Sequence, residues 1–205
     1  MRRLRNLLTF LMILPARTAL AQVPDSATTE TAVFAGGCFW GVDAVFKHVR
    51  GVISVVSGYA GGGAATAFYP VVSTGLTGHA ESVRVTYDPR QLSYRKLLEV
   101  FFAVAHDPTQ LNRQGPDEGT QYRSAIFYVT EAQRQAAQAY IGDLTQSRAF
   151  RDPIVTQVVP LQRFFPAEAY HQDYLAHHLT QPYIVYNDLP KVRLLEQRFP
   201  ELYRP

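Results

Sequence analysis

The sequence predicts an α+β fold, a two-layer sandwich with a ferredoxin-like βαββαβ core and C-terminal extensions. Its length of 205 residues suits one domain rather than two. Strand-like and helix-like segments alternate in the order strand, helix, strand, strand, helix, strand, and a further helix and strand follow. No internal repeat, low-complexity tract or long glycine and serine linker divides residues 22–205, so we expect a single domain over that range.

Four elements are expected in the first half of the chain, bounded by glycine or polar residues. In order, they are a strand over 31–35, a helix from Cys38 to Gly51, a strand over 52–57 and a strand over 81–87. The helix rests on apolar residues at helical spacing, and the second strand on its β-branched residues. In the last segment Val83, Val85 and Tyr87 share one face, because side chains alternate along a strand, so we expect it to be half-buried.

The second half begins with a helix that Ser93 caps and that Asp107-Pro108 ends near His106. A long polar loop follows. The remaining expected elements are a strand over 124–129, a helix over 130–146 and a strand over 154–159. Thr130 and Gln133 have the spacing of a capping box, which marks the start of that helix.

Composition and charge exclude two broad classes of protein. Hydrophobic residues make up 47% and charged residues 18%, which is enough apolar surface to exclude global disorder. The formal net charge is +3, but four of the 20 basic residues lie within the first 21 positions, which leaves 16 against 17 acidic residues and a net charge of −1. Balanced charge gives no electrostatic reason to bind nucleic acid.

Residues 1–21 have the pattern of a signal peptide. Arginines open the segment, residues 7–14 are mostly apolar, and Ala19-Leu20-Ala21 has the small-x-small form that signal peptidase cleaves. The apolar stretch falls far short of the roughly 20 residues that span a bilayer as a helix, which disfavours a membrane anchor. We expect export to the periplasm, a mature chain from Gln22 and no stable membrane association after cleavage.

Cys38 is the only cysteine of the chain, and it lies where the first helix begins. The positive end of the helix dipole and free backbone amides favour the thiolate, so we expect a reactive residue. Gly36 and Gly37 allow a tight turn that exposes the side chain, and an exported protein rarely carries an unpaired thiol without use. The alternative is a buried structural cysteine that acts as a small hydrophobic residue.

The string Gly37-Cys38-Phe39-Trp40-Gly41 resembles the catalytic signature of the peptide methionine sulfoxide reductase A family, enzymes that repair one epimer of methionine sulfoxide. Other blocks match that family in the same order. They are residues 57–62, 77–81, 106–110, 117–124, 165–168 and 170–175. The resemblance covers residues 33–177, and ordered blocks of this number do not arise by chance.

The resemblance implies an oxidoreductase that reduces the S-epimer of methionine sulfoxide, free or in proteins, and so repairs oxidative damage. It implies Cys38 as the nucleophile, Glu81 as the acid, and Tyr69, Asp117 and Tyr122 as polar residues of the site. Attack on the sulfoxide sulfur turns the cysteine into a sulfenic acid. No cofactor is implied, and no HExxH motif or cysteine pair indicates a metal site.

Local chemistry is consistent with several of these roles. Glu81 has the strand parity of Val83, so it projects from the apolar face, where desolvation raises a carboxyl pKa and keeps the proton available for donation. Tyr69 and Tyr122 lie in polar, glycine-containing loops from which a phenol could donate to a sulfoxide oxygen. Asp117 alone has the character of an ordinary turn residue, so its role rests on the resemblance.

Phe39 and Trp40, on the first helical turn, are expected to line an apolar pocket for the thiomethyl group of the substrate. Many members of the family regenerate the cysteine with further cysteines, often toward the C-terminus, and this chain has none. We therefore expect an external thiol reductant of the thioredoxin, glutaredoxin or glutathione type to reduce Cys38 directly.

Three other classes stay open at this point. A cysteine hydrolase would pair Cys38 with His79 and form an acyl-enzyme. A thiol peroxidase would also form a sulfenic acid, but would consume peroxide. A non-catalytic exported binding module would bind its partner without needing the thiol. A structural role is the simpler interpretation of His79, His106 and His171.

Overall fold

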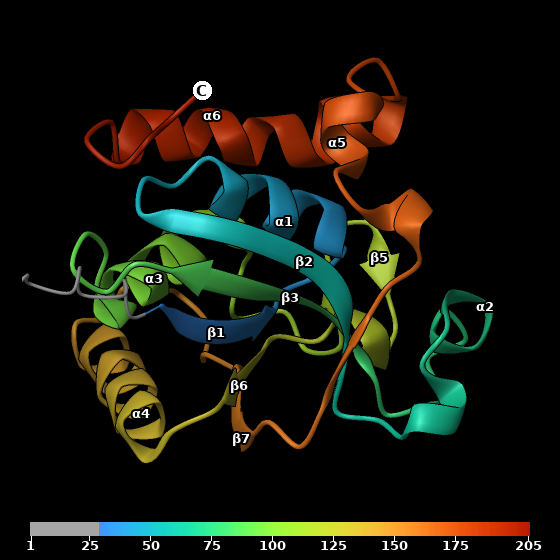
Figure 1. The fold of residues 1–205 in the computed structure, drawn as a ribbon. Coiled ribbons are helices and arrows are strands. Elements are labelled where there is room, and N and C mark those ends of the chain that lie inside the picture. Colours follow the sequence, from blue (N-terminus) through green and yellow to red (C-terminus); the bar gives the residue numbers. More distant parts are fainter. Residues whose placement is uncertain (1–28) are drawn as a thin grey trace, which may run out of the picture.

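The computed structural model describes residues 29–205 as an α+β fold (Figure 1). The signal peptide expected at residues 1–21 and the cleavage before Gln22 lie outside the described residues. Among the described residues, none of the helices has the length and apolar character that crossing a bilayer requires.

A curled mixed sheet forms the centre of the fold, in the strand order β7-β6-β1-β3-β2-β8. Its strands are β1 (Glu30–Ala35), β2 (Val52–Ala60), β3 (Ala80–Tyr87), β6 (Ala125–Tyr128), β7 (Gln157–Pro160) and β8 (Phe164–Pro166). Neighbouring strands are antiparallel except for β6 and β7, which run parallel. The predicted α+β class is therefore confirmed.

Within residues 29–205, six α-helices accompany the sheet. They are α1 (Phe39–Lys47), α2 (Tyr69–Val72), α3 (Tyr94–Val100), α4 (Glu131–Gln146), α5 (Tyr174–His177) and α6 (Leu189–Arg198). A π-helical turn, Phe101–Ala105, continues α3 as far as His106. Both predicted caps are confirmed, since the hydroxyl of Ser93 accepts the amide of Lys96 at 3.2 Å and that of Thr130 accepts the amide of Gln133 at 3.2 Å.

The predicted end of the second strand was wrong. Strand β2 continues from Ser57 through Gly58 to Ala60. A Cβ at Gly58 would lie 2.3 Å from the carbonyl oxygen of Phe165, so this glycine allows β8 to approach β2 closely. The glycine predicted to end the strand therefore makes room for the neighbouring strand β8.

Two other element boundaries differ from the prediction, because the backbone groups there form hydrogen bonds with distant segments of the chain. Helix α1 ends at Lys47 rather than near Gly51, and the next turn bonds the C-terminus, with the amide of Arg50 donating to the carbonyl of Leu202 at 2.7 Å. Strand β7 starts at Gln157 rather than at 154, because the amide of Val155 donates to Pro108 instead of to the sheet. The polar loop holds an unexpected hairpin, β4 (Arg113–Gln114) with β5 (Asp117–Glu118).

The main hydrophobic core lies between one face of the sheet and the helices. Phe34 of β1 stacks against Phe46 of α1 at 5.2 Å and against Phe101 at 4.8 Å between ring centroids. A smaller cluster on the opposite face contains Val33 and Phe127. Strand β3 keeps the predicted alternation from Val83 to Tyr87, where Arg84 and Thr86 are only partly buried, whereas Ser82 at its start is buried as well.

Candidate active site

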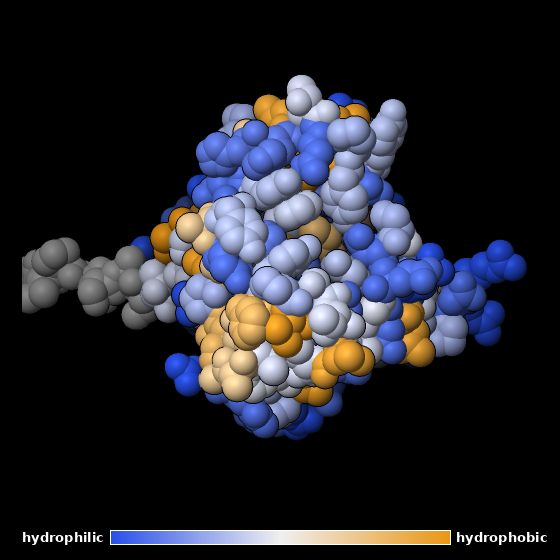
Figure 2. Space-filling view, turned by 90° about the vertical axis from the view of Figure 1, so that its right-hand side faces the viewer, coloured by the Kyte–Doolittle hydropathy of each residue, from blue (hydrophilic) through white to orange (hydrophobic). Residues whose placement is uncertain are grey.

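The first turn of α1 presents Cys38, which is the residue just before the helix. The backbone of Gly37 has φ of +90°, and a Cβ there would lie 2.5 Å from the Gln114 side chain. Only glycine fits both restrictions, so the sequence around Gly37 fixes how the chain enters the helix. The N-terminal end of α1 lies beside β5, on the side of the molecule shown in Figure 2. This face is mostly hydrophilic, and its largest group of hydrophobic residues lies in the lower part of the view.

Cys38 is 7% exposed, and its thiol is the only one in the chain. Burial raises the pKa of the thiol well above its usual value, and the nearby carboxyl groups of Glu81, Asp188 and Asp117 raise it further, while the amide of Trp40 lowers it. The expectation of a thiolate stabilised by the helix N-terminus is therefore wrong for the resting protein. Desolvation outweighs the favourable backbone amide, and the residue rests as a thiol.

Glu81 lies beneath that helical turn and is 2% exposed. Its Oε2 accepts the backbone amide of Phe39 at 3.1 Å. Burial raises the pKa of the carboxyl to about 8, although the Phe39 hydrogen bond opposes the shift, and the charges of Asp117 and Asp188 add to it. A carboxyl with this pKa holds its proton at neutral pH and can donate it.

Three more of the predicted residues gather around these two groups. Burial, followed by the charges of Glu81 and Cys38, raises the pKa of Tyr69 to about 12, and burial and Glu81 raise the pKa of Tyr122 as well. Both phenols are therefore neutral hydrogen-bond donors at neutral pH. Asp117, at the start of β5, accepts a hydrogen bond from the hydroxyl of Tyr183, and burial raises its pKa.

Phe39 and Trp40 form an aromatic wall next to the thiol. Phe39 is 1% exposed and belongs to the main core, whereas Trp40 is only partly buried. The indole of Trp40 stacks on Tyr174 at 3.7 Å between centroids, and its Nε1 donates to Nδ1 of His171 at 3.2 Å. His171 thus holds the indole in place, and its ring must carry its proton on Nε2.

The other two histidines considered from the sequence have structural partners. His79 bonds Gly62 through one ring nitrogen, at 3.3 Å, and Gly63 through the other, at 3.0 Å. His106 bonds the carbonyl of Phe101 and the hydroxyl of Ser124, and burial lowers its pKa to about 4. Neither ring has a nitrogen left to activate the thiol, which disfavours the cysteine hydrolase.

The C-terminal segment supplies residues that sequence reasoning missed. Asp188 is 0% exposed, 3.3 Å from Nζ of Lys191, and so close to α1 that a Cβ at Gly41 would lie 2.2 Å from its Oδ1. Tyr183 bonds Asp117 and lies edge-on to Trp40 at 6.0 Å. No periodic pattern marks this segment in the sequence, and only the three-dimensional structure shows that it borders the site.

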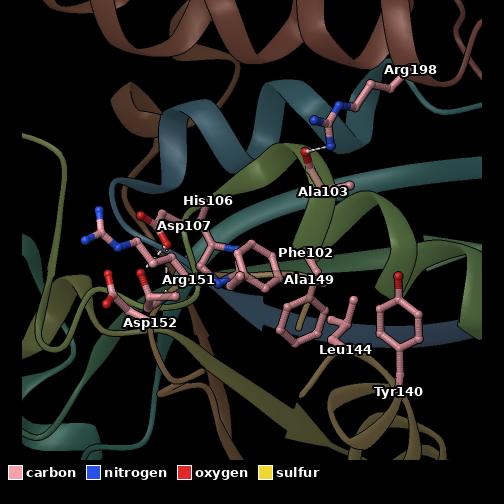
Figure 3. Close-up of a pocket in the computed structure, with 12 residues that line it drawn as sticks. Phe102, Ala103, His106, Asp107, Tyr140, Leu144, Ala149, Arg151, Asp152 and Arg198 are labelled. Carbon is pink, nitrogen blue, oxygen red and sulfur yellow. Dashed lines mark hydrogen bonds between the residues drawn. The ribbon is translucent and has the colours of Figure 1, made fainter. Parts of the chain in front are cut away.

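A separate cavity of about 490 Å³ lies between α4, the π-helical turn and the end of α6 (Figure 3). Phe102, Tyr140 and Leu144 line one part of it, and Arg151 and Asp152 lie in another. None of the predicted site residues contributes to its wall. Among residues 29–205 no group of three or more histidine, cysteine or acidic side chains is placed to hold a metal ion.

The comparisons with known proteins agree with one another. A family model described as peptide methionine sulfoxide reductase matches residues 30–202. The peptide methionine sulfoxide reductase MsrA 2 of Mesorhizobium japonicum is 59% identical over 175 residues, covering 85% of this chain and 90% of that protein. The MsrA of Deinococcus radiodurans is 50% identical over 178 residues, which are 87% of this chain and 86% of that protein.

Two solved structures have the same fold. Mxr1 from Saccharomyces cerevisiae in reduced form matches with a TM-score of 0.69 and 32% identity, covering 76% of this chain and 89% of the yeast chain. The methionine sulfoxide reductase A of Corynebacterium diphtheriae matches with a TM-score of 0.65 and 36% identity, covering 76% of this chain and 77% of the other.

The raised pKa of Glu81 predicts a pH-dependent stability. Between pH 4.5 and about 8 this carboxyl keeps its proton in the folded protein and loses it on unfolding. The folded state then binds more protons, so the free energy of unfolding falls as pH rises, by about 1.4 kcal/mol per pH unit from this group. We expect Glu81→Gln to flatten the decline, as measured by chemical denaturation at several pH values. Parallel curves for the two proteins would show that the carboxyl titrates normally.

Proposed function

Since this chain belongs to the peptide methionine sulfoxide reductase family and reduces methionine sulfoxide, we propose that Cys38 is its nucleophile and Glu81 its general acid. The observation that carries these roles is the protonated carboxyl of Glu81 held by the amide of Phe39, the residue next to the thiol. A nucleophile and a proton donor thus meet at one helical turn.

The proposed step transfers the sulfoxide oxygen from the substrate to Cys38. The sulfur of Cys38 bonds to the sulfoxide sulfur while Glu81 protonates the sulfoxide oxygen, and the proton of the thiol passes to the carboxylate that remains. The hydroxyl group then passes from the substrate sulfur to the cysteine sulfur as the S–S bond and the substrate S–O bond break, so that methionine leaves and a sulfenic acid remains. The cysteine sulfur loses two electrons, the substrate sulfur gains two, and Glu81 ends in its original protonated form.

The other predicted residues bind and orient the substrate in this proposal. The phenols of Tyr69 and Tyr122 donate hydrogen bonds to the sulfoxide oxygen, where negative charge develops. Asp117, tied to Tyr183, completes the polar side of the site. The faces of Phe39 and Trp40 accept the methyl group, and this handed arrangement selects the S-epimer of free or peptide-bound methionine sulfoxide.

An external thiol of the thioredoxin, glutaredoxin or glutathione type then regenerates the enzyme, because the chain contains no second cysteine that could form a disulfide with Cys38.

From the composition of residues 1–21 we also propose export to the periplasm. We propose a single domain over residues 22–205. The antiparallel strand order β6-β1-β3-β2 supports describing the centre of the sheet as a ferredoxin-like plait.

Substitution of the nucleophile tests the proposal directly. We expect Cys38→Ser to abolish reduction of methionine sulfoxide while the fold is retained, because a serine hydroxyl has no comparable nucleophilicity at neutral pH. The assay uses the separate S and R epimers, free and in a peptide, with dithiothreitol, and circular dichroism as the control for folding. Turnover by the serine variant, or equal turnover of both epimers by the wild type, would contradict the assignment.

Glu81→Gln is expected to slow the reductase step by roughly a hundredfold or more, the range typical for loss of a general acid. In the wild type the rate of that step should decline as pH rises through about 8, where Glu81 loses its proton. Single-turnover measurements of methionine release across that range check both statements. An unchanged rate in the variant would assign the acid to another residue.

The lone cysteine predicts the stoichiometry without reductant. We expect about one methionine per active site and then no further release, because the sulfenic acid has no partner in its own chain. Dimedone should then add once to the intact protein at Cys38, as mass spectrometry would show, and a small thiol should restart turnover. Continued release with no thiol present would mean that another route regenerates the enzyme.

A further inference from the structure

The side chain of Glu168 connects two elements that border the active site. It follows β8, at the start of the short 3-10 turn Ala169–His171. One carboxylate oxygen accepts the backbone amide of Tyr69 at 2.8 Å, and the other accepts the hydroxyl of Tyr59 at 2.8 Å. These contacts span 99 and 109 residues of sequence, so they form only in the folded chain.

The backbone amide of Tyr69 is anchored by this contact, while its ring packs against His171 at 4.4 Å between centroids. Tyr69 is the first residue of α2, so its amide has no acceptor within the helix. Helix α2 has only four residues, too few for a helix to be stable by itself, and the preceding Phe68 is 44% exposed. The carboxylate of Glu168 therefore fixes the backbone from which the phenol of Tyr69 extends.

The second acceptor connects the same carboxylate to the rigid part of the site. Tyr59 is fully buried in β2, its ring lies 6.0 Å from that of Phe39, and it pairs in register with Glu81 on β3. Glu168 thus holds Tyr69 at a fixed position relative to the strand pair that carries the acid.

The backbone around Glu168 is itself held firmly. The amide of Ala167 donates to the carbonyl of Ser57 at 2.9 Å, and the side-chain amide of Gln172 bonds both the amide and the carbonyl of Ser57 at 3.0 Å each. The segment on either side of Glu168 is therefore attached to β2. Because this turn is attached to β2 and the Glu168 carboxylate bonds the first residue of α2, the carboxylate fixes the position of α2 relative to β2.

We propose that Glu168 is a positioning residue of the reductase, whose carboxylate holds the Tyr69 phenol in place to donate to the sulfoxide oxygen. The inference rests on the proposed role of Tyr69. Glu168 acts through Tyr69 and does not touch the substrate. Partial burial opposes ionisation, but the hydrogen bonds from Tyr69 and Tyr59 and the proximity of His171 leave the pKa of Glu168 below its usual value, so the acceptor stays charged at neutral pH.

A double-mutant cycle tests this coupling. The single-turnover rate of methionine release is measured for the wild type, Glu168→Ala, Tyr69→Phe and the double variant. We expect each single substitution to lower the rate about tenfold, the effect of one lost hydrogen bond in the transition state, with little change in KM. The double variant should be no slower than Tyr69→Phe, because the carboxylate acts only through that phenol.

Matched variants separate positioning from stability. Ser93→Ala removes one hydrogen bond at the cap of α3, outside the site, so it should lower the melting temperature yet leave the rate within about twofold of the wild type. Glu168→Gln keeps an acceptor for the Tyr69 amide and a donor for the Tyr59 oxygen, and should restore most of the rate. If Glu168→Ala does not fold, Glu168→Asp, which keeps the charge but shortens the reach, takes its place in the cycle.

Two results would overturn the proposal. If the rate loss of the double variant equalled the product of the losses in Glu168→Ala and Tyr69→Phe, Glu168 would act independently of the phenol. An unchanged rate in Tyr69→Phe would remove the role of Tyr69 and the positioning role together. Neither result would affect the nucleophile, which Cys38→Ser tests separately, so failure of this inference is distinguishable from failure of the proposed function.

Discussion

Desolvation of the Glu81 carboxyl beneath the first turn of α1 is the constraint on which the site depends. In water this group would be ionised at neutral pH, and an ionised carboxylate beside Cys38 would repel a developing thiolate. Burial raises the pKa of Glu81 and so keeps the carboxyl group neutral at neutral pH. The hydrogen bond from the amide of Phe39 orients it. The same burial also keeps the thiol protonated, so both groups hold their protons until an acceptor such as the sulfoxide oxygen arrives.

The fold maintains this burial from three directions. The parity of β3 directs Glu81 toward the main core, together with Val83 and Val85. The hairpin of β4 and β5 places Asp117 on one side, and the C-terminal segment brings Asp188 against the helix. The added acidic groups raise the pKa of Glu81 further, so the negative surroundings serve the acid more than the nucleophile.

Local chemistry in the sequence was enough to predict the α+β class, both helix caps and the buried orientation of Glu81. These features depend on neighbouring residues, where periodicity and capping act directly. The protonation state of Cys38 was mispredicted, because the helix N-terminus is visible in the sequence whereas the depth of burial is not. The ends of β2 and β7 were misplaced for a related reason, since Phe165 and Pro108 decide them from far along the chain. The positions of Tyr183 and Asp188 beside the active site could not be predicted, because no hydrophobic periodicity in the sequence marks these residues.

The nucleophile and two of the residues that border its helix, His171 and Asp188, lie toward opposite ends of the described chain. The hydrogen bond from Trp40 to His171 spans 131 residues, and Asp188 lies only 17 positions before the C-terminal Pro205. During synthesis, which proceeds from the N-terminus, Cys38 leaves the ribosome long before the residues that enclose it. A chain without residues 171–188 lacks the contacts that these residues make with α1. Assembly of the surroundings of the thiol therefore needs a segment that is synthesised late.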